Sequence, residues 1–213
     1  MPTGTRRPTA ERRQEIALAV LRIVGERGLA ALTTTTLAHE IGVTSGALFR
    51  HFASRDEILD ATVRHAIARI EATFPAASLP PLERLLALAR NRVQLLASDR
   101  GLAWLLRSEQ AYLSLPPAAV ESLGELAAKS KRFLLGAVRE GVRDGSIRGD
   151  IEPQAMVVLV MGTIHALVGL PGVQGRTTRA GLADVEQVLS ALERVLVPAG
   201  VPRPGRRATR RKH

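Results

Sequence analysis

The chain has 213 residues, of which 46% are hydrophobic and 3% aromatic, with a net charge of +10 and no cysteine. This hydrophobic content is typical of a folded protein with one or two cores, so disorder cannot dominate the chain. The lack of cysteine excludes disulfides, thiolate metal sites and cysteine nucleophiles. The positive charge favours a polyanionic partner, either a nucleic acid or an anionic membrane surface.

Hydrophobic spacing indicates helices throughout the chain. Ala and Leu are abundant, and no segment sustains the alternation of apolar and polar residues that marks a strand. We therefore predict an all-α fold. The basic N-terminal segment and the charge-interrupted apolar stretch after it match neither a signal peptide nor a membrane anchor, so a cytoplasmic location is expected.

The first helix is predicted to run from Thr9 to about Arg27. Its apolar residues have helical spacing, and Gly28 would stop it. Four arginines near its start could contact phosphates that flank a DNA site, or could belong to a solvated terminus. These arginines are Arg6, Arg7, Arg12 and Arg13.

Two short helices joined by a tight turn are predicted between Leu32 and Glu57. Thr33 can cap the first helix, because a hydroxyl at that position accepts a hydrogen bond from an otherwise unpaired amide. Gly42 can end it, since glycine adopts a left-handed conformation at the least cost. Thr44 can cap the second helix, from about Ser45 to Phe52. This arrangement is a helix-turn-helix.

The second of these helices has an apolar face and an outward face. Leu48 and Phe52 lie four residues apart on one face, whereas Gly46 and Arg50 lie four apart on another. Small and cationic residues on the outward face would allow a DNA backbone to approach closely.

A capping box follows this helix. Ser54 and Glu57 form an S-x-x-E sequence, in which each side chain satisfies the backbone of the other residue. The sequence therefore predicts a third helix from about Arg55.

These residues resemble the DNA-binding segment of the TetR family of one-component bacterial transcription regulators. The matching residues are Thr33 to Ala38, Gly42-Val43-Thr44, Leu48-Phe49-Arg50-His51-Phe52 and Arg55. Two residues depart from the family pattern: Phe49 replaces the usual tyrosine, and Thr35 stands where some members carry a basic residue. The resemblance implies a homodimer that binds a palindromic operator as double-stranded DNA, most often as a repressor, and is released by a small-molecule effector.

The resemblance also implies roles for individual residues. Those implied to face phosphates are Thr33, Thr34, Phe49, His51 and Arg55, with a further backbone contact from the capping hydroxyl of Thr44. Those implied to face base edges are Ser45, Gly46 and Arg50. Arginine is the commonest specific reader of guanine in the major groove. If the segment were an ordinary helical hairpin in a core, the exposed Gly46 and Arg50 would have no role.

Apolar periodicity and proline boundaries predict the helices of the second half. They cover about residues 55–74, 81–96, 102–112, 120–145, 155–170 and 182–196. The predicted organisation is a DNA-binding domain over residues 9–54, an effector-binding and dimerisation domain over 55–197, and a basic tail over 198–213. The tail holds six basic residues between Arg203 and Lys212, which are expected to be disordered and to add salt-sensitive DNA affinity at most.

The helix over residues 155–170 is apolar on all sides, which predicts burial on more than one side. It is shorter than the roughly 20 residues that a membrane span needs, so no membrane partner is expected. Together with residues 182–196, whose leucines have a three-four spacing, it is expected to form a homodimer interface. His165 fits an interface histidine better than a metal ligand, and no metal or cofactor is predicted.

Six residues are candidates for an effector pocket between the middle helices. They are His65, Phe74, Trp104, Glu109, Tyr112 and Phe133. Simple core packing is the alternative, because large side chains at helical spacing usually belong to a core. Their spacing identifies no particular ligand.

Two other classes of protein fit the sequence less well. An enzyme would need a catalytic constellation, and the chain has no H-E-x-x-H, G-x-S-x-G or phosphate-loop sequence. A basic protein that coats membranes or the nucleoid would bind by charge alone. Residues 1–60 hold eight basic and seven acidic residues, so the helix-turn-helix region is nearly neutral. Selective binding of one palindromic duplex over random competitor separates a regulator from this class.

Overall fold

The structure, a computed structural model, describes residues 9–169 and 179–198, with side chains in the last helix described from residue 184 onward. Every regular element in these ranges is a helix, which confirms the predicted all-α fold. Residues 170–178, residues 199–213 and the arginines Arg6 and Arg7 lie outside the described residues, so the predictions made for them stay predictions.

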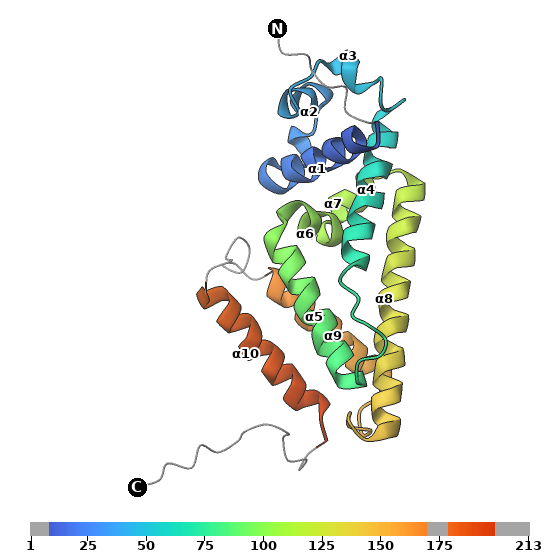
Figure 1. Cartoon of the computed structure of the whole chain (residues 1–213), viewed down its shortest axis with the longest axis vertical. Coiled ribbons are helices and arrows are strands. Elements are labelled where there is room, and N and C mark those ends of the chain that lie inside the picture. The colour runs from blue at the N-terminus through green and yellow to red at the C-terminus, as the bar shows by residue number, and fades with distance from the viewer. Residues whose placement is uncertain (1–8, 170–178, 199–213) are drawn as a thin grey trace.

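The N-terminal helices form a small head at one end of the molecule (Figure 1). It contains α1 (Thr9–Arg27), a 3₁₀ turn η1 (Leu29–Ala31), α2 (Thr34–Glu40) and α3 (Ser45–Leu48). Gly28 and Gly42 end α1 and α2 with φ values of 77° and 68°, a left-handed conformation that glycine adopts without strain. The turn η1 is not visible in the apolar spacing of the sequence.

A compact core holds the head together. Leu48 and Phe52 are each 1% exposed and pack with residues of α1, α2 and the next helix. That next helix is α4 (Arg55–Glu71), and its first-turn residues Ile58 and Leu59 belong to this core. Because α4 begins in the head and continues into the second half, a movement of α4 reaches the other helices of the head directly.

The second half is a bundle of helices around a larger core (Figure 1). It contains α5 (Pro81–Ser98), α6 (Arg100–Arg107), α7 (Glu109–Ser114), α8 (Pro117–Asp144), α9 (Pro153–Gly169) and α10 (Arg179–Leu196). Pro81 opens α5 as predicted, and Pro117 opens α8 three residues before the predicted start at residue 120, since the first turn needs no amide donor from proline. Gly145 ends α8 with a φ of 80°.

One predicted helix is in fact two. The segment 102–112, predicted as a single helix, divides at Ser108 into α6 and α7. Ser108 is extended (φ −90°, ψ 119°), and its hydroxyl accepts a hydrogen bond from the amide of Ala111 at 3.4 Å. A serine that caps a new helix offers the backbone an alternative to continuing the old one, which explains the break.

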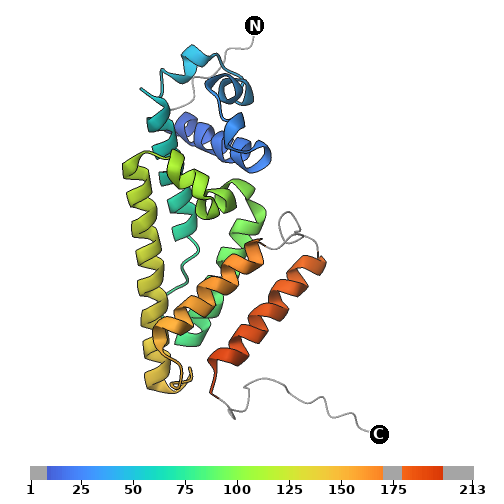
Figure 2. The ribbon, with the colours of Figure 1, turned by 180° about the vertical axis from the view of Figure 1, so that it is seen from behind.

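The helices α9 and α10 lie next to each other, with α10 at one side of the bundle (Figure 2). The predicted α10 seam is buried within its own subunit at Val185, Leu189, Leu192 and Leu196. It packs against α5 and α9, so these side chains are not on the exposed face; Leu182 lies outside the described side chains. The outer face still carries apolar residues, with Val158 69% and Leu159 43% exposed on α9. Among the described helices, none is both long and apolar enough to cross a membrane.

Candidate DNA-binding and effector sites

Two threonine hydroxyls define the helix-turn-helix. Thr33 Oγ1 accepts a hydrogen bond from the amide of Thr36 at 3.0 Å, and Thr44 Oγ1 accepts one from the amide of Ala47 at 3.2 Å. Both capping predictions are therefore confirmed. The amide of Val43 donates to the carbonyl of Ala38 at 2.9 Å and closes the turn between the helices.

The helix α3 is shorter than predicted. The sequence predicts a helix to about Phe52, whereas α3 ends at Leu48 and continues as a tight turn. In that turn the amides of Arg50 and His51 donate to carbonyls three residues earlier, at 3.3 and 3.1 Å. Such three-residue bonds tighten the end of a helix and rotate the following side chains away from α-helical positions.

The predicted outward face is exposed. Ser45, Gly46 and Arg50 all face solvent, while Leu48 beneath them is buried. Phe49 is 46% exposed and thus lies on the surface rather than in the core. A small, uncharged helix start followed by Phe49 and Arg50 gives a surface that can enter a DNA groove, with one cation to contact a base or phosphate.

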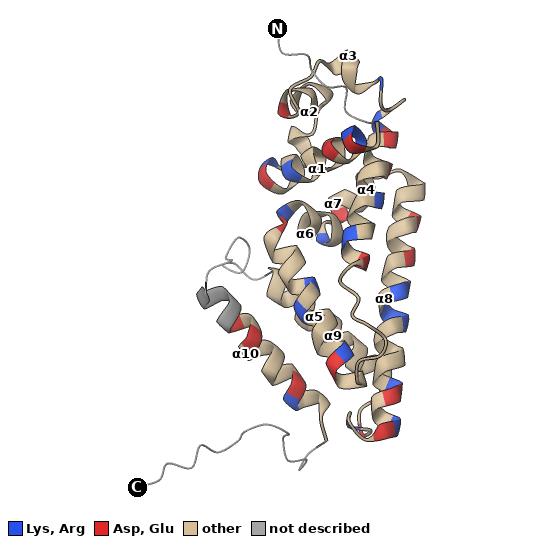
Figure 3. Cartoon of the chain, in the orientation of Figure 1, with Lys and Arg blue, Asp and Glu red and all other residues tan. Residues whose placement is uncertain are grey.

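The residues implied to face phosphates lie around this surface. Thr33 and Arg55 are exposed, and Thr34 and His51 are partly buried. Thr33, Thr34 and Arg55 border the same small hollow, which places the starts of α2 and α4 next to each other. Figure 3 shows α3 itself without charge, as its sequence requires.

Arg13 on α1 organises the head, a role that the sequence did not reveal. Its guanidinium forms an ion pair with Glu57 at 2.6 Å and donates to the carbonyl of His51 at 3.2 Å. Its guanidinium carbon also lies 4.4 Å from the ring centre of Phe52. These contacts occupy Arg13, so the prediction that it contacts flanking phosphates is not supported in this structure. Arg12 likewise pairs with Glu15, at 2.8 Å.

The capping box at the start of α4 differs from the expected pattern in one bond. Ser54 Oγ accepts from the amide of Glu57 at 3.1 Å, as predicted. The carboxylate of Glu57 accepts from the amide of Ala53 at 2.6 Å instead of the amide of Ser54. This bond and the guanidinium of Arg13 lower the pKa of Glu57 below its usual value.

Glu40 provides a second tie within the head. Its carboxylate at the end of α2 pairs with Arg22 at 2.7 Å and with Arg27 at 2.6 Å, both on α1. The hydrogen bond from Arg27 lowers the pKa of Glu40, and the charge of Arg22 adds to this effect. The two ion pairs join the end of α2 to α1.

The six candidate pocket residues do not form one site. Phe74 and Phe133 meet edge to face, with ring centres 5.1 Å apart. Trp104 packs against both cores at the junction of the head and the bundle. Glu109 and Tyr112 are exposed on α7, Tyr112 at 39%.

His65 lies on α4 and is partly buried. Its Nε2 atom is buried without a hydrogen-bond partner. Burial, and then the charge of Arg69, lower the pKa of His65, while Asp99 acts in the opposite direction. Arg69 itself pairs with Asp99, which connects α4 to the start of α6.

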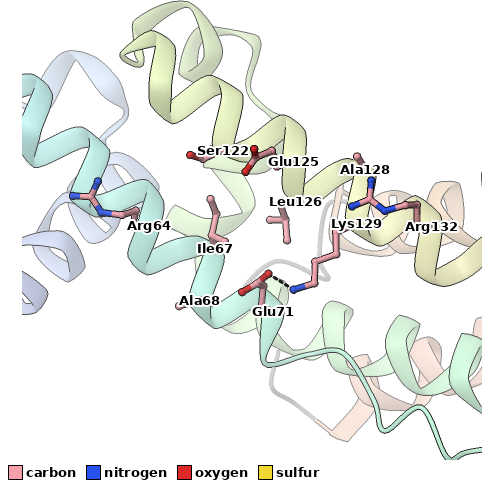
Figure 4. Close-up of a pocket in the computed structure, with 10 residues that line it drawn as sticks. All are labelled: Arg64, Ile67, Ala68, Glu71, Ser122, Glu125, Leu126, Ala128, Lys129 and Arg132. Atoms are coloured by element: carbon pink, nitrogen blue, oxygen red, sulfur yellow. Dashed lines mark hydrogen bonds and ion pairs between the residues drawn. The ribbon is translucent and has the colours of Figure 1, made fainter.

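A groove of about 730 Å³ lies between α4 and α8 (Figure 4). None of the six candidate residues lines it. Its charged residues are Arg64, Glu71, Glu125, Lys129 and Arg132, and its floor includes Ile67 and Leu126. Lys129 pairs with Glu71 across the groove, and its ammonium lies 5.6 Å from the ring centre of Phe74. The groove therefore adjoins the phenylalanine pair. Within the described residues, no cluster of His, Asp and Glu has the arrangement of a metal site.

The head matches a known protein family. Residues 18–62 match the family model described as bacterial regulatory proteins, tetR family. The repressor KstR2 of Rhodococcus jostii is 26% identical over 144 residues, which cover 66% of this chain and 70% of that protein. The nucleoid occlusion factor SlmA of Haemophilus influenzae is 34% identical over 94 residues, 44% of this chain and 38% of its own length.

Solved structures share the fold over most of the chain. The ketosteroid transcriptional regulator KstR2 of Mycobacterium tuberculosis superposes with a TM-score of 0.70 at 23% identity, covering 84% of this chain and 94% of that one. AibR in complex with isovaleryl coenzyme A and operator DNA superposes with a TM-score of 0.71 at 20% identity, covering 88% and 98%. The match in the head, with its capped helix-turn-helix, and this shared fold lead to one conclusion: residues 18–62 form a helix-turn-helix of the tetR family of bacterial regulatory proteins, on a chain whose overall fold is that of KstR2 and AibR.

Proposed function

We propose that the protein is a homodimeric repressor that binds a palindromic operator and is released by a small-molecule effector. The observation that carries the DNA-binding role is the exposed surface from Ser45 to Arg50, held in place by the buried side chains of Leu48 and Phe52. The KstR2 proteins are repressors by name, and AibR was solved with operator DNA, which supports the same role here.

The exposed apolar residues of α9 and α10 support the homodimer. Val158, Leu159, Val188 and Val195 are between 38% and 69% exposed although all four are large and hydrophobic. Exposed apolar residues gathered on two neighbouring helices suit an interaction surface. A dimer with two-fold symmetry presents two reading heads and requires a roughly palindromic site.

We place the functional boundary at residues 9–54 for DNA binding and 55–197 for effector binding and dimerisation, with residues 198–213 as a basic tail. The head and bundle are joined by α4 and by the packing of α1 on α6. An effector that binds the bundle can release DNA only by its difference in affinity between two arrangements of this joint. To change the population ratio of two such arrangements from 1:99 to 99:1, the effector must bind one of them more tightly by about 5.5 kcal/mol.

For the DNA reader, the residues proposed are Thr33, Thr34, Thr44, Ser45, Gly46, Phe49, Arg50, His51 and Arg55. For the effector, we propose the region of Phe74 and Phe133 beside the α4–α8 groove. Selection from random duplexes, followed by competition with unrelated duplex at moderate salt, tests the proposal. A two-fold symmetric site bound at least a thousandfold more tightly than random duplex supports it. Equal binding of all duplexes would show a protein that coats DNA by charge alone.

A further inference from the structure

Arg92 on α5 is a partly buried cation, and one of its hydrogen-bond donors is buried without a partner. Its Nε donates to Thr73 Oγ1 at 2.9 Å, and its guanidinium carbon lies 5.5 Å from the ring centre of Phe74. Its Nη2 atom is buried and has no partner in the structure. Burial lowers the pKa of Arg92 to about 10, which leaves it charged at neutral pH.

The other arginines of α5 are neutralised, and Arg92 is not. Arg84 pairs with Glu140, and Arg90 makes two hydrogen bonds to Glu186 at 2.7 and 2.9 Å. Within the described part of the chain, Arg92 has no ion pair. The segments outside it, 1–8, 170–178 and 199–213, contain no Asp or Glu side chain.

Two further basic residues, Arg107 and His165, interact electrostatically in the region of Arg92. Partial burial, and then the charges of Arg107 on α6 and Arg92 on α5, lower the pKa of His165 on α9. No carboxylate contributes to that shift among the described residues. Arg107 also lies against Gly169 at the end of α9, where its guanidinium would meet a Cβ atom at position 169. Arg107 and His165 are exposed, whereas Arg92 is partly buried and has an unpartnered donor. A partly buried charge without a carboxylate partner, with two exposed basic groups nearby, favours an anionic ligand.

We propose that the effector carries an oxyanion, either a carboxylate or a phosphate, and that Arg92 binds this group with His165 and Arg107 as neighbouring donors. The inference rests on the proposed function and specifies the class of effector. The ring pair of Phe74 and Phe133 next to Arg92 suits an apolar or aromatic body attached to the anion. A planar guanidinium forms two parallel hydrogen bonds to such a group.

The position of Arg92 connects this site to DNA binding. Thr73, the residue that Arg92 contacts, donates through its hydroxyl to the carbonyl of Ile70 at the end of α4. Asn91 also donates to the carbonyl of Thr73, at 3.1 Å. An anion that draws Arg92 away from Thr73 therefore loosens the C-terminal end of α4, the helix whose first turn belongs to the head.

The experiment compares acids with an uncharged compound of similar shape. Benzoate, phenyl phosphate and benzamide are titrated by calorimetry into the full-length wild type, Arg92→Met and Arg90→Met. We expect wild type and Arg90→Met to bind at least one acid about tenfold more tightly than benzamide, and Arg92→Met to lose this preference, because the charged hydrogen bond is removed. If benzoate binds more tightly than phenyl phosphate, the effector is a carboxylate. If phenyl phosphate binds more tightly, the effector is a phosphate.

Stability without any compound gives a second measurement. Arg92→Met should unfold at the same temperature as wild type or a higher one, since it removes an unpaired buried donor. A clear loss of stability, benzamide binding as tight as that of both acids, or no binding of either acid to wild type would each overturn the inference. Operator binding by wild type without any compound is measured separately. If wild type binds no operator selectively, the proposed function is refuted, but the result for the anion still stands.

Discussion

Gly101 on α6 lies against the main chain of Leu21 on α1, because a Cβ atom at position 101 would overlap the carbonyl oxygen of Leu21 and lie 2.8 Å from its Cα. Gly25, one turn further along α1, is equally close: its Cβ would lie 2.5 Å from the amide nitrogen of Gly101. The two helices therefore cross backbone to backbone. This crossing joins the head to the bundle independently of α4.

Replacing Gly101 with Ala should separate the two helices and destabilise the protein. The added methyl group meets main-chain atoms that cannot rotate away, so we expect a loss of about 1–3 kcal/mol in the free energy of unfolding. Gly136→Ala on α8 is the matched control, because nothing lies within 4 Å of its Cβ. The control should gain up to about 1 kcal/mol from helix propensity. Denaturant unfolding checks both, and equal stability of the two variants would mean that the crossing is looser than described.

Arg50 and Arg55 should differ in how they affect DNA binding. Arg50 lies on the exposed reading surface, so Arg50→Ala should cost about 1–3 kcal/mol on the selected operator and relax its sequence preference. Arg55→Ala should weaken operator and random duplex alike and reduce the salt dependence. Binding isotherms on both duplexes at two salt concentrations check this. If Arg50→Ala kept the sequence preference of wild type, Arg50 would not be a residue that contacts base edges.

Phe49→Tyr tests the surface position of this aromatic residue. Phe49 is 46% exposed, so the added hydroxyl can remain in water, and the stability should change by less than about 0.5 kcal/mol. The operator affinity should be equal or higher, because the hydroxyl can donate to a phosphate. Phe52→Tyr is the control in the buried neighbour, which is 1% exposed, and it should destabilise the fold. Thermal unfolding and operator binding are measured on both variants.

Val158→Asp should prevent dimerisation. Val158 is 69% exposed on α9 in the single chain, and a carboxylate at that position would be buried without a partner in a dimer. Sedimentation equilibrium should show a monomer with strongly reduced affinity for the palindromic site. Leu113→Asp on α7 is the control, since Leu113 is 80% exposed on another helix and should remain dimeric. Dimeric Val158→Asp would place the subunit contact elsewhere.

Acid should weaken the head through Glu57 and Glu40. The pKa values of both carboxylates are lowered in the folded state, so their stabilising contribution is present above the usual value of 4.5 and is lost as the pH falls through the lowered values. Glu57→Gln should therefore show a smaller loss of stability between neutral pH and pH values below 4.5. Unfolding curves across that range check this. A loss as steep as that of wild type would show that the Ala53 amide and Arg13 do not stabilise the carboxylate of Glu57 in solution.

The sequence by itself determined the features that depend on local chemistry. Threonine and serine caps, positive-φ glycines and prolines at first turns act within a few residues, and these predicted most helix boundaries and the helix-turn-helix. The buried pair Leu48 and Phe52 followed from spacing alone. The break at Ser108 also has a local cause, the capping serine. The prediction missed it because the apolar spacing continues across residues 102–112 and favours one helix.

Only the tertiary structure decided which charges are paired and which helices cross. Arg13 is tied to Glu57, 44 residues away in sequence, whereas Arg92 lacks a carboxylate although Arg90 beside it has one. Nothing in the spacing of these residues distinguishes them, because an ion pair depends on where the whole chain brings two side chains together. The same holds for Gly25 and Gly101, which contact each other only because α1 packs on α6. The head could be predicted from its sequence; its connection to the bundle and the cationic site at Arg92 required the fold.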